Sequence, residues 1–371
     1  MKILHINCNY MDSWLHQNMI EQLSELKVEN QVFVPVYDST GHSVVPKAYV
    51  KACECFKKRD RIIYQYKQAK ILKCVQNEYN ISDFDCIHAY TVFTDGNIAR
   101  KLHKKYGIPY VVAVRNTDIN NFFKYMLHLR KVGIGVLRDA FAIFFLSPAY
   151  KGELFDKYIP MCYRKELLGK SYIIPNGIDK FWICNEKNEI NDRLKHICRK
   201  EVRFIFVGNI DKNKNVLFVA EAINKLIFEG WKVQFDVVGK VKDYAQYKKL
   251  VLYDFVHYYE PMDKEKLMHM YRNNDIFVMT SHTESFGLVY AEALSQGLPV
   301  IYTKGQGFDK QFPDGFIGYA ASDTDIVDLL EKIKKILSNY ETIVKNIRGA
   351  ALKFSWKEIC DEYKKIYLNI K

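Results

Sequence analysis

The stretch at residues 275–303 constrains the fold most, because it reads as strand, turn, helix and second strand. Residues 276–279 form a short apolar run of strand-forming residues, and 300–302 form another. Between them, Ser285 is expected to cap a helix that ends before Gly297. A helix that joins two consecutive strands is typical of a parallel sheet, whose ligands lie beyond the carboxyl ends of the strands.

The turn of this unit leads from one glutamate, Glu284, to a second, Glu292, eight positions later. Glu284 would stand at the mouth of the helix, where the first NH groups, on Phe286, Gly287 and Leu288, lack partners and attract anions. In an ideal helix the two carboxylates would lie about 12 Å apart along the axis, which suits the two ends of a polyhydroxyl ligand. For an arbitrary pair of glutamates, two solvated surface residues are the plainer interpretation.

Strand and helix patterns alternate along the rest of the chain. Apolar runs predict further strands, and amphipathic runs predict helices, with strands at 2–7, 31–36, 84–90, 110–114, 142–147, 202–207 and 233–238 and helices at 15–26 and 216–226. This alternation predicts an α/β fold with doubly wound parallel sheets. A chain of 371 residues is too long for one ordinary core and suits two domains.

Composition narrows the classes of function. The formal net charge is +12, and residues 1–180 hold 26 Lys and Arg against 17 Asp and Glu. Such a basic half suits an anionic partner, whether nucleic acid, an acidic membrane or a phosphorylated acceptor, although an unspecific basic surface is the alternative. The nine cysteines are scattered without metal-ligand spacing, so reduced thiols are expected. The start shows no secretion signal and no apolar run is long enough to span a membrane, which predicts a cytoplasmic protein.

Residues 55–78 interleave seven Lys and Arg with aromatic and aliphatic residues. This pattern predicts a basic amphipathic helix or a pair of helices. In one interpretation the basic residues from Lys57 to Lys73 contact an anionic membrane at the inner face of the cell membrane, at about 1 kcal/mol per basic residue. In the other, a helix covers a sheet and its basic face is solvated.

The motifs of the second half, taken together, resemble the retaining glycosyltransferases of family 4, which have the GT-B fold. Glu284-Ser-Phe-Gly-Leu, followed by Glu292-Ala and by Gly297-Leu-Pro-Val, is similar to the Glu-x7-Glu signature of that family. Pro175-Asn-Gly-Ile-Asp179 and the stretch around Trp356 also resemble family segments. The resemblance covers nearly the whole chain and is strongest at 202–303.

The resemblance implies two Rossmann-like domains that face each other across a cleft. Residues 1–180 would bind the acceptor, and residues 181–353 would bind a nucleotide sugar. Residues 354–371 would form a C-terminal helix that packs back on the first domain. Polar and charged residues predominate at 181–200, which are expected to form a linker.

In the second domain the resemblance implies a donor site. Glu292 would bind the ribose hydroxyls of the nucleotide, and Glu284 would bind hydroxyls of the sugar. Lys214 keeps the position of a family lysine that binds the diphosphate, whereas Asn209 replaces the family's arginine. The other donor contacts would come from Gly208 and from the backbone of Ser285, Phe286, Gly287 and Leu288.

In the first domain the resemblance implies an acceptor site or interdomain cleft with contributions from Asn9, Tyr10, His88 and Asp118. The turn at 8–13 lacks the glycines with which relatives approach the donor phosphates. The strand at 110–114 leads to Arg115-Asn-Thr-Asp118, where the family has His-Gly-Thr-Asp. Arg115 is expected either to stabilise the leaving phosphate as a permanent cation or to hold an interdomain salt bridge.

The hypothesis that follows is a retaining hexosyltransferase with Glu284, Lys214 and Arg115 as catalytic residues. It would move a hexose from a nucleotide diphosphate sugar to a glycan or lipid-linked glycan in bacterial surface polysaccharide biosynthesis, such as that of lipopolysaccharide or capsule. Retaining members of the family need no metal, so neither a metal nor a cofactor is expected. A nucleotide-sugar epimerase of the same fold and a nucleic-acid-binding protein without enzymatic activity are the alternatives. Because the aromatic residues form no RNP-like motif, nucleic acid is not an expected partner.

Overall fold

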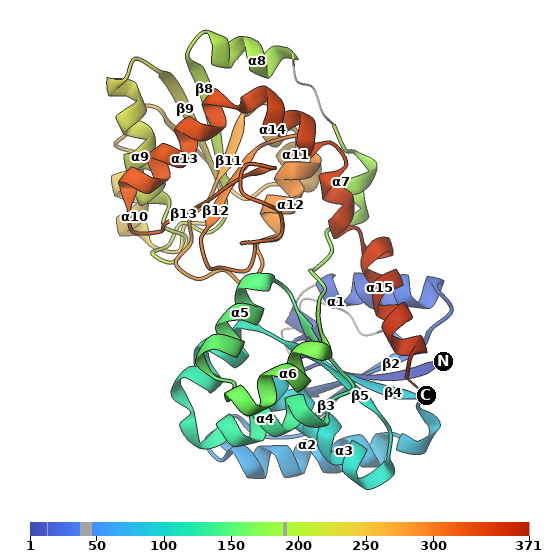
Figure 1. Cartoon of the computed structure of the whole chain (residues 1–371). Helices are drawn as coiled ribbons and strands as arrows, with labels where there is room; N and C mark the ends of the chain where they lie inside the picture. The colour runs from blue at the N-terminus through green and yellow to red at the C-terminus, as the bar shows by residue number, and fades with distance from the viewer. Residues whose placement is uncertain (13, 38–46, 188–190, 371) are drawn as a thin grey trace. The chain divides into compact units, whose positions relative to one another are not determined.

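The computed structural model describes residues 1–12, 14–37, 47–187 and 191–370 and divides into two compact units. The first unit comprises Met1–Gly177 and Trp356–Lys371, and the second comprises Ile178–Ser355. Each unit is a parallel sheet with helices against it, which confirms the predicted α/β fold (Figure 1). The last residue of the turn predicted at 8–13, and residues 188–190 of the predicted linker, lie outside the described residues.

The first unit is built on a sheet of seven parallel strands in the order β3-β2-β1-β4-β5-β6-β7. The strands are β1 (Lys2–Ile6), β2 (Glu29–Val36), β3 (Val50–Glu54), β4 (Cys86–Ala89), β5 (Tyr110–Val114), β6 (Ala142–Phe145) and β7 (Ser171–Ile173). The strand order reverses between β1 and β4, and ligands of such sheets bind outside the carboxyl ends of the strands at this point.

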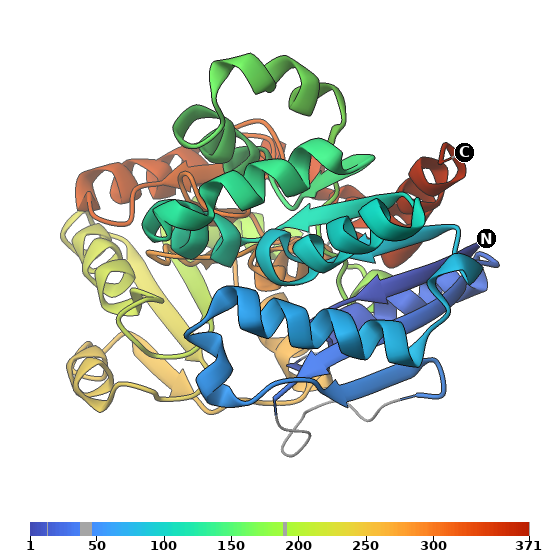
Figure 2. The same ribbon diagram turned by 90° about the horizontal axis from the view of Figure 1, so that it is seen from below.

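Helices cover both faces of this sheet. One face carries α1 (Trp14–Glu25) and α15 (Trp356–Leu368), and the other carries α2 (Tyr64–Glu78), α3 (Asn97–Tyr106), α4 (Arg130–Asp139), α5 (Pro148–Lys157) and α6 (Met161–Gly169). Figure 2 views the unit from the side that α2 and α3 cover. Because successive strand residues point to opposite faces, Val112 packs beneath the second group of helices while Val111 packs against the first.

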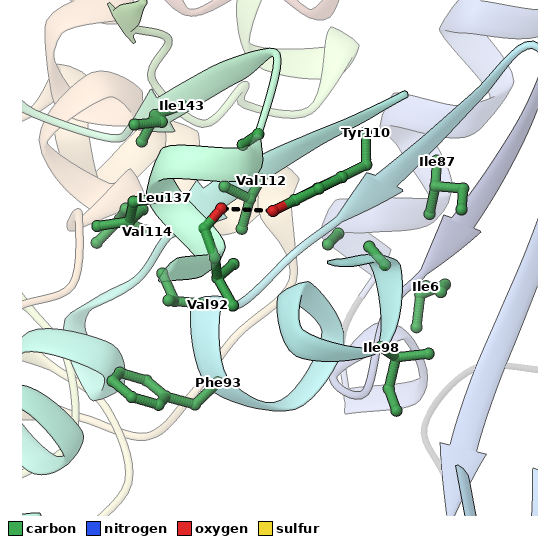
Figure 3. Close-up of a cluster of buried hydrophobic side chains, with 14 of the residues drawn as sticks. Ile6, Ile87, Val92, Phe93, Ile98, Tyr110, Val112, Val114, Leu137 and Ile143 are labelled. Atoms are coloured by element: carbon green, nitrogen blue, oxygen red, sulfur yellow. Dashed lines mark hydrogen bonds between the residues drawn. The ribbon is translucent and has the colours of Figure 1, made fainter. Parts of the chain in front are cut away.

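Figure 3 shows the core on the second of these faces. Tyr110, Val112 and Val114 of β5 point into it together with Leu137 of α4. The hydroxyl of Tyr110 is buried and donates a hydrogen bond of 2.5 Å to the carbonyl of Val136, so its polar end costs little to bury. This core fixes β5 and the turn that follows it.

The C-terminal helix α15 packs on the first unit, as predicted. Its neighbour is α1, and Lys364 Nζ donates to the carbonyl of Leu26, which follows α1, at 2.9 Å. The hydroxyl of Tyr367 lies 2.6 Å from Nδ1 of His88 on β4. Two segments separated by almost the whole chain therefore share one core.

The second unit has six parallel strands in the order β10-β9-β8-β11-β12-β13. Its strands are β8 (Glu201–Val207), β9 (Lys232–Val238), β10 (Val256–Tyr259), β11 (Ile276–Val278), β12 (Val300–Thr303) and β13 (Gly318–Ala321). Its helices are α7 (Lys180–Cys184), α8 (Asn191–Cys198), α9 (Val216–Phe228), α10 (Tyr244–Leu250), α11 (Lys264–Arg272), α12 (Leu288–Ser295), α13 (Ile326–Ser338) and α14 (Tyr340–Ile347). The order reverses between β8 and β11, so the turns after these two strands meet where a ligand is expected.

The predicted linker at 181–200 is wrong, because α7 and α8 occupy most of it. Asp179 caps α7 by accepting a hydrogen bond of 2.8 Å from the NH of Phe181, and Trp182 is buried against Tyr271. In α8 the buried guanidinium of Arg193 donates to the carbonyl of Gly297 at 2.8 Å and to three further carbonyls. The polar composition suggested a linker because α8 is attached to the unit by the hydrogen bonds of a buried arginine, whereas most helices are attached by apolar side chains.

The basic stretch at 55–78 forms a short 3-10 turn, η2 (Lys58–Arg61), followed by α2. Asp60 joins the two parts, since its carboxylate accepts from the NH of Lys57 at 2.8 Å and from Lys70 Nζ at 2.6 Å. Across the described ranges, no helix combines the length and the apolar character needed to cross a membrane.

Candidate functional site

The turns after β8 and β11 are held together by the side chain and backbone of Asn213. Its carbonyl accepts from the NH of His282 at 2.8 Å, and its amide exchanges two hydrogen bonds of 3.0 Å with the backbone of Thr283. Six parallel strands alone would not fix the relative position of two loops. Asn213 therefore sets the geometry of the site at the switch point of the second unit.

Asn215 adds a second connection and begins α9. It adopts a left-handed conformation with φ of 58°, which Asn tolerates better than most residues. Its amide donates to the carbonyls of Thr280 and Asp323 at 3.2 and 2.8 Å. The NH of Lys214 donates to the carboxylate of Asp211 at 2.8 Å. These contacts fix the backbone of the loop, and the side chain of Lys214 points toward Glu284.

Lys214 and Glu284 form the central contact of the site. The ammonium of Lys214 lies 2.5 Å from Oε2 of Glu284, and the side chains are only 21% and 11% exposed. The backbone of Glu284 is also fixed, because its NH donates to Gln306 at 3.0 Å and its carbonyl accepts from Gly307 at 3.1 Å. The structure thus brings together two predicted catalytic residues that are 70 positions apart.

The start of helix α12 differs from the prediction. The helix begins at Leu288 with Gly287 as its N-cap, so the predicted cap at Ser285 is wrong. Gly287 has φ of 78°, and a Cβ on it would lie 2.4 Å from the ring of Tyr290. Only glycine suits that position, and the helix cannot begin until the chain has passed it. Ser285 lies in the turn before it.

The turn from Ser285 to Leu288 offers backbone rather than side chains to a ligand. The ring of Phe286 is buried and packs against Phe308 and Phe354, with ring centres 5.7 and 5.6 Å apart. Gly307 approaches this turn so closely that a Cβ on it would lie 2.0 Å from the carbonyl oxygen of Ser285. Ordinary side chains at position 307 would displace the turn.

Glu292 lies on α12 and is partly buried beside Tyr271 of α11. Burial raises the pKa of its carboxyl to about 7, although the Tyr271 hydroxyl at 3.4 Å and the charge of Lys264 act in the opposite direction. Lys264 itself forms an ion pair with Asp179. The carboxyl of Glu292 is therefore poised between its neutral and charged forms near neutral pH.

The other predicted donor residues lie in the turn after β8. The NH of Gly208 donates to the carbonyl of Val238 at 2.9 Å, and Gly239 approaches so closely that a Cβ on it would lie 1.8 Å from the carbonyl oxygen of Gly208. Asn209 is exposed in the same turn. The sequence predicted these residues but not Asn213, Asn215 and Gln306. The available signal for the two asparagines was their position in a turn on either side of Lys214.

In the first unit, Asp118 serves as an acceptor for the backbone. Its buried carboxylate accepts hydrogen bonds from the NH groups of Val92, Phe93 and Arg115 at 2.9 to 3.3 Å. Burial raises the pKa of Asp118 to about 6, and these three NH groups limit the rise. The residue ties the turn after β5 to the turn after β4.

The guanidinium of Arg115 is partly buried and makes two contacts within the first unit. Its Nε donates to the carbonyl of Tyr90 and its Nη1 donates to Oδ1 of Asn176, both at 3.2 Å. These neutral acceptors leave the positive charge of Arg115 uncompensated by either contact.

Three of the four residues predicted for the acceptor site, Tyr10, His88 and Asp118, are buried. Tyr10 is 1% exposed, and His88 is fully buried with its ring stacked on Tyr90 at 4.3 Å. Asn9 is exposed, and it lines a cavity of about 340 Å³ together with Asp118. We call this cavity the first-unit pocket; its walls include Asn9, Phe56, Lys67, Thr94, Asp118 and Asn121.

All nine cysteines are free thiols. The described part of the chain contains no group of three or more His, Cys, Asp or Glu residues arranged to hold a metal ion.

Comparison with known proteins places this geometry in context. Residues 188–352 match the family model of glycosyl transferases group 1. The chain is 24% identical over 366 residues to an uncharacterized glycosyltransferase of Methanocaldococcus jannaschii, covering 95% of this chain and 92% of the relative. It is 26% identical over 275 residues to the capsular polysaccharide biosynthesis glycosyltransferase CapM of Staphylococcus aureus, covering 69% and 68%. Two further curated relatives are matched over only 47% and 46% of their length.

Among solved structures, Anabaena HepE in complex with UDP and glucose is similar, with a TM-score of 0.66 and 16% identity over 98% of both chains. At that identity the likeness concerns the fold.

Proposed function

We propose that this chain transfers a hexose from a nucleotide diphosphate sugar, because residues 188–352 match the family model of glycosyl transferases group 1 and the fold is similar to that of Anabaena HepE. The acceptor is a glycan or lipid-linked glycan of a bacterial surface polysaccharide. Transfer retains the configuration of the sugar and requires no metal. The relative named for capsular polysaccharide biosynthesis and the similar structure that holds UDP and glucose support this assignment.

The observation that carries the proposal is the pair of Lys214 and Glu284 at the switch point of the second unit. A diphosphate needs a cation, which Lys214 supplies, and a sugar needs an acceptor for its hydroxyls, which Glu284 supplies. Without a donor, Lys214 and Glu284 form an ion pair with each other. When the donor binds, its phosphate takes Lys214 as partner and the hydroxyls of its sugar take Glu284. The buried setting strengthens both interactions.

The proposed mechanism relies on stabilising charge in the transition state and involves no covalent intermediate with the protein. As the bond between sugar and diphosphate breaks, negative charge grows on the leaving phosphate, and in this proposal Lys214 and the backbone NH groups near Gly287 stabilise it. We assign no nucleophile, so the acceptor attacks from the face that the diphosphate leaves.

Glu292→Ala is expected to raise the Kd for UDP at least tenfold. The carboxylate accepts hydrogen bonds from the ribose hydroxyls, and hydrogen bonds to a charged group contribute about 1.5–3 kcal/mol. Since the pKa of Glu292 is about 7, affinity for UDP should rise between pH 6 and 8 in the wild type as the carboxyl ionises. Isothermal titration calorimetry at several pH values measures both effects.

Glu265→Ala on α11 is the matched control, because Glu265 is exposed and lies in the same unit. Its affinity for UDP and the pH dependence should equal those of the wild type. The ribose assignment is wrong if Glu292→Ala binds UDP as tightly as the wild type does.

Two other functions are separated by simple measurements. A nucleotide-sugar epimerase of the same fold would convert the donor in the absence of any acceptor, which NMR of the sugar would reveal. A nucleic-acid-binding protein would bind oligonucleotides at ~0.15 M salt, where we expect negligible binding. Release of UDP that depends on an added glycan supports the transferase.

We also propose that the first unit contacts anionic membranes through η2 and the start of α2. Ile62, Ile63 and Tyr66 are 86%, 63% and 51% exposed, and basic residues from Lys57 to Lys73 surround them. Burying an aliphatic side chain in lipid contributes about 1.5–3 kcal/mol, and each nearby basic residue about 1 kcal/mol. Such contact would bring the enzyme to a lipid-linked acceptor.

Replacing both isoleucines, by Ile62→Asp and Ile63→Asp together, should lower binding to phosphatidylglycerol vesicles more than tenfold in co-sedimentation. Ile227→Asp is the control, because Ile227 is exposed in the second unit. Equal binding by the double variant and the wild type would refute the contact, and so would equal binding to phosphatidylcholine vesicles.

A further inference from the structure

Two cations of the first-unit pocket lie against aromatic rings instead of acids. The ammonium of Lys67 on α2 is 4.8 Å from the centre of the Phe56 ring, and the guanidinium of Arg61 is 4.4 Å from the centre of the Tyr37 ring. Neither forms a hydrogen bond or an ion pair with any residue that the structure describes. Because Lys67 is partly buried, its charge has lost part of its hydration without gaining an acceptor.

The uncharged wall of the pocket also presents donors. Thr94 follows β4, and Thr117 and Asn121 follow β5. Their side chains make no hydrogen bond within the described ranges. These three residues line the cavity, and Thr117 and Asn121 are exposed, so their polar groups are open to a ligand at the carboxyl edge where doubly wound sheets bind ligands.

The two nearby buried carboxylates already accept hydrogen bonds within the unit, and the charge of Asp95 also acts on Lys67. Asp118 accepts from three NH groups, and Asp95 accepts from the NH of Cys8 at 3.3 Å and the hydroxyl of Thr91 at 3.1 Å. Both are fully or almost fully buried beneath the pocket. Asp12 is the remaining acid in the wall, and its side chain is exposed.

We propose that the first-unit pocket binds an anionic group, a phosphate or a carboxylate, of the sugar acceptor. Lys67 supplies a point charge and Arg61 a planar fork, and Thr94, Thr117 and Asn121 complete the donors around the anion. A cavity of about 340 Å³ holds such a group with part of the sugar that bears it. This inference rests on the proposed transferase function and specifies the chemical class of its acceptor.

The test is titration of the full chain with inorganic phosphate and with glucuronate, followed by NMR or calorimetry, with glycerol as the uncharged comparison. Lys67→Gln should weaken anion binding at least tenfold, and Arg61→Gln, at an exposed position that tolerates substitution, should weaken it severalfold. Lys73→Gln is the matched control, because Lys73 is an exposed lysine of the same helix outside the pocket. Thermal unfolding of each variant shows that it is folded.

Stronger binding of phosphate or of glucuronate identifies which anion the acceptor carries, and either result supports the inference. Absence of saturable binding to both, or an equal loss in Lys73→Gln, overturns it. An equal loss of UDP affinity in Lys67→Gln also overturns it, because the pocket would then belong to the donor. The activity of the protein on nucleotide sugars is assayed separately. A protein that binds phosphate in the first-unit pocket but has no activity on nucleotide sugars would refute the transferase function and leave the pocket supported.

Discussion

Lys214→Gln is expected to lower kcat/KM for the nucleotide sugar by about 10²–10³, the usual cost of removing one group that stabilises developing negative charge in a buried site. Lys214 is the cation nearest Glu284, at 2.5 Å, and both side chains are largely buried. The glutamine keeps the length of the chain and loses the charge. Initial rates of UDP release at several donor concentrations measure the effect.

Lys212→Gln is the matched control for this variant. Lys212 lies two positions earlier in the same turn, with an exposed side chain, so its removal changes the local charge without touching Glu284. We expect less than a twofold change in kcat/KM. If the two variants lose activity equally, the turn acts through its overall charge, and the specific role of Lys214 is refuted.

The motifs selected Lys214 and Glu284 as site residues from local sequence alone, and the structure brings these two side chains into contact. Glu284, Glu292 and Lys214 were found from a turn, a helix and a position in a family pattern. Asn213 and Gln306 were missed, since their role is to bind backbone that is far away in the sequence. The two asparagines beside Lys214 mark a turn, but no local pattern reports which distant backbone groups they bind.

The failures of prediction share a physical cause. Ser285 is a good capping residue, but the left-handed Gly287 and the close approach of Gly307 delay the helix. Residues 181–200 are polar, but Arg193 reaches backbone carbonyls at the ends of α11 and α12. In each case a tertiary contact overrides a local preference, which is why strands, defined by buried apolar runs, were predicted closest to their observed bounds.

Three histidines of the first unit lie in one buried cluster. His5 of β1 has both ring nitrogens satisfied, by Tyr90 at 3.0 Å and Asn30 at 2.9 Å. Nδ1 of His16 and Nε2 of His88 have no partner among the residues described. Burial lowers the pKa of His5 to about 4 and that of His16 to about 3, and it lowers the pKa of His88 as well. All three are therefore neutral in the folded protein at neutral pH.

Acidification is expected to destabilise the first unit steeply. The unfolded chain binds a proton at each histidine near pH 6.5, whereas the folded unit does not, so its free energy of unfolding is fully retained above pH 6.5 and falls as the pH drops toward 4. At pH 5 the loss is about 2 kcal/mol for each of His5 and His16. Hydrogen–deuterium exchange of peptides from β1 and β4, corrected for the intrinsic effect of pH, measures it for this unit alone.

His16→Leu should flatten that pH dependence, because it removes one group whose proton uptake drives unfolding while its apolar side chain suits the buried site. His128→Gln is the control, since His128 is exposed and lies outside the buried cluster. If the protection of β1 and β4 against hydrogen exchange stays constant from pH 7.5 to 5, the histidines of the cluster gain protons without loss of stability, and the prediction is wrong. Because His88 bonds Tyr367, the same acidification should loosen α15 first, where exchange in peptides near Tyr367 would report it.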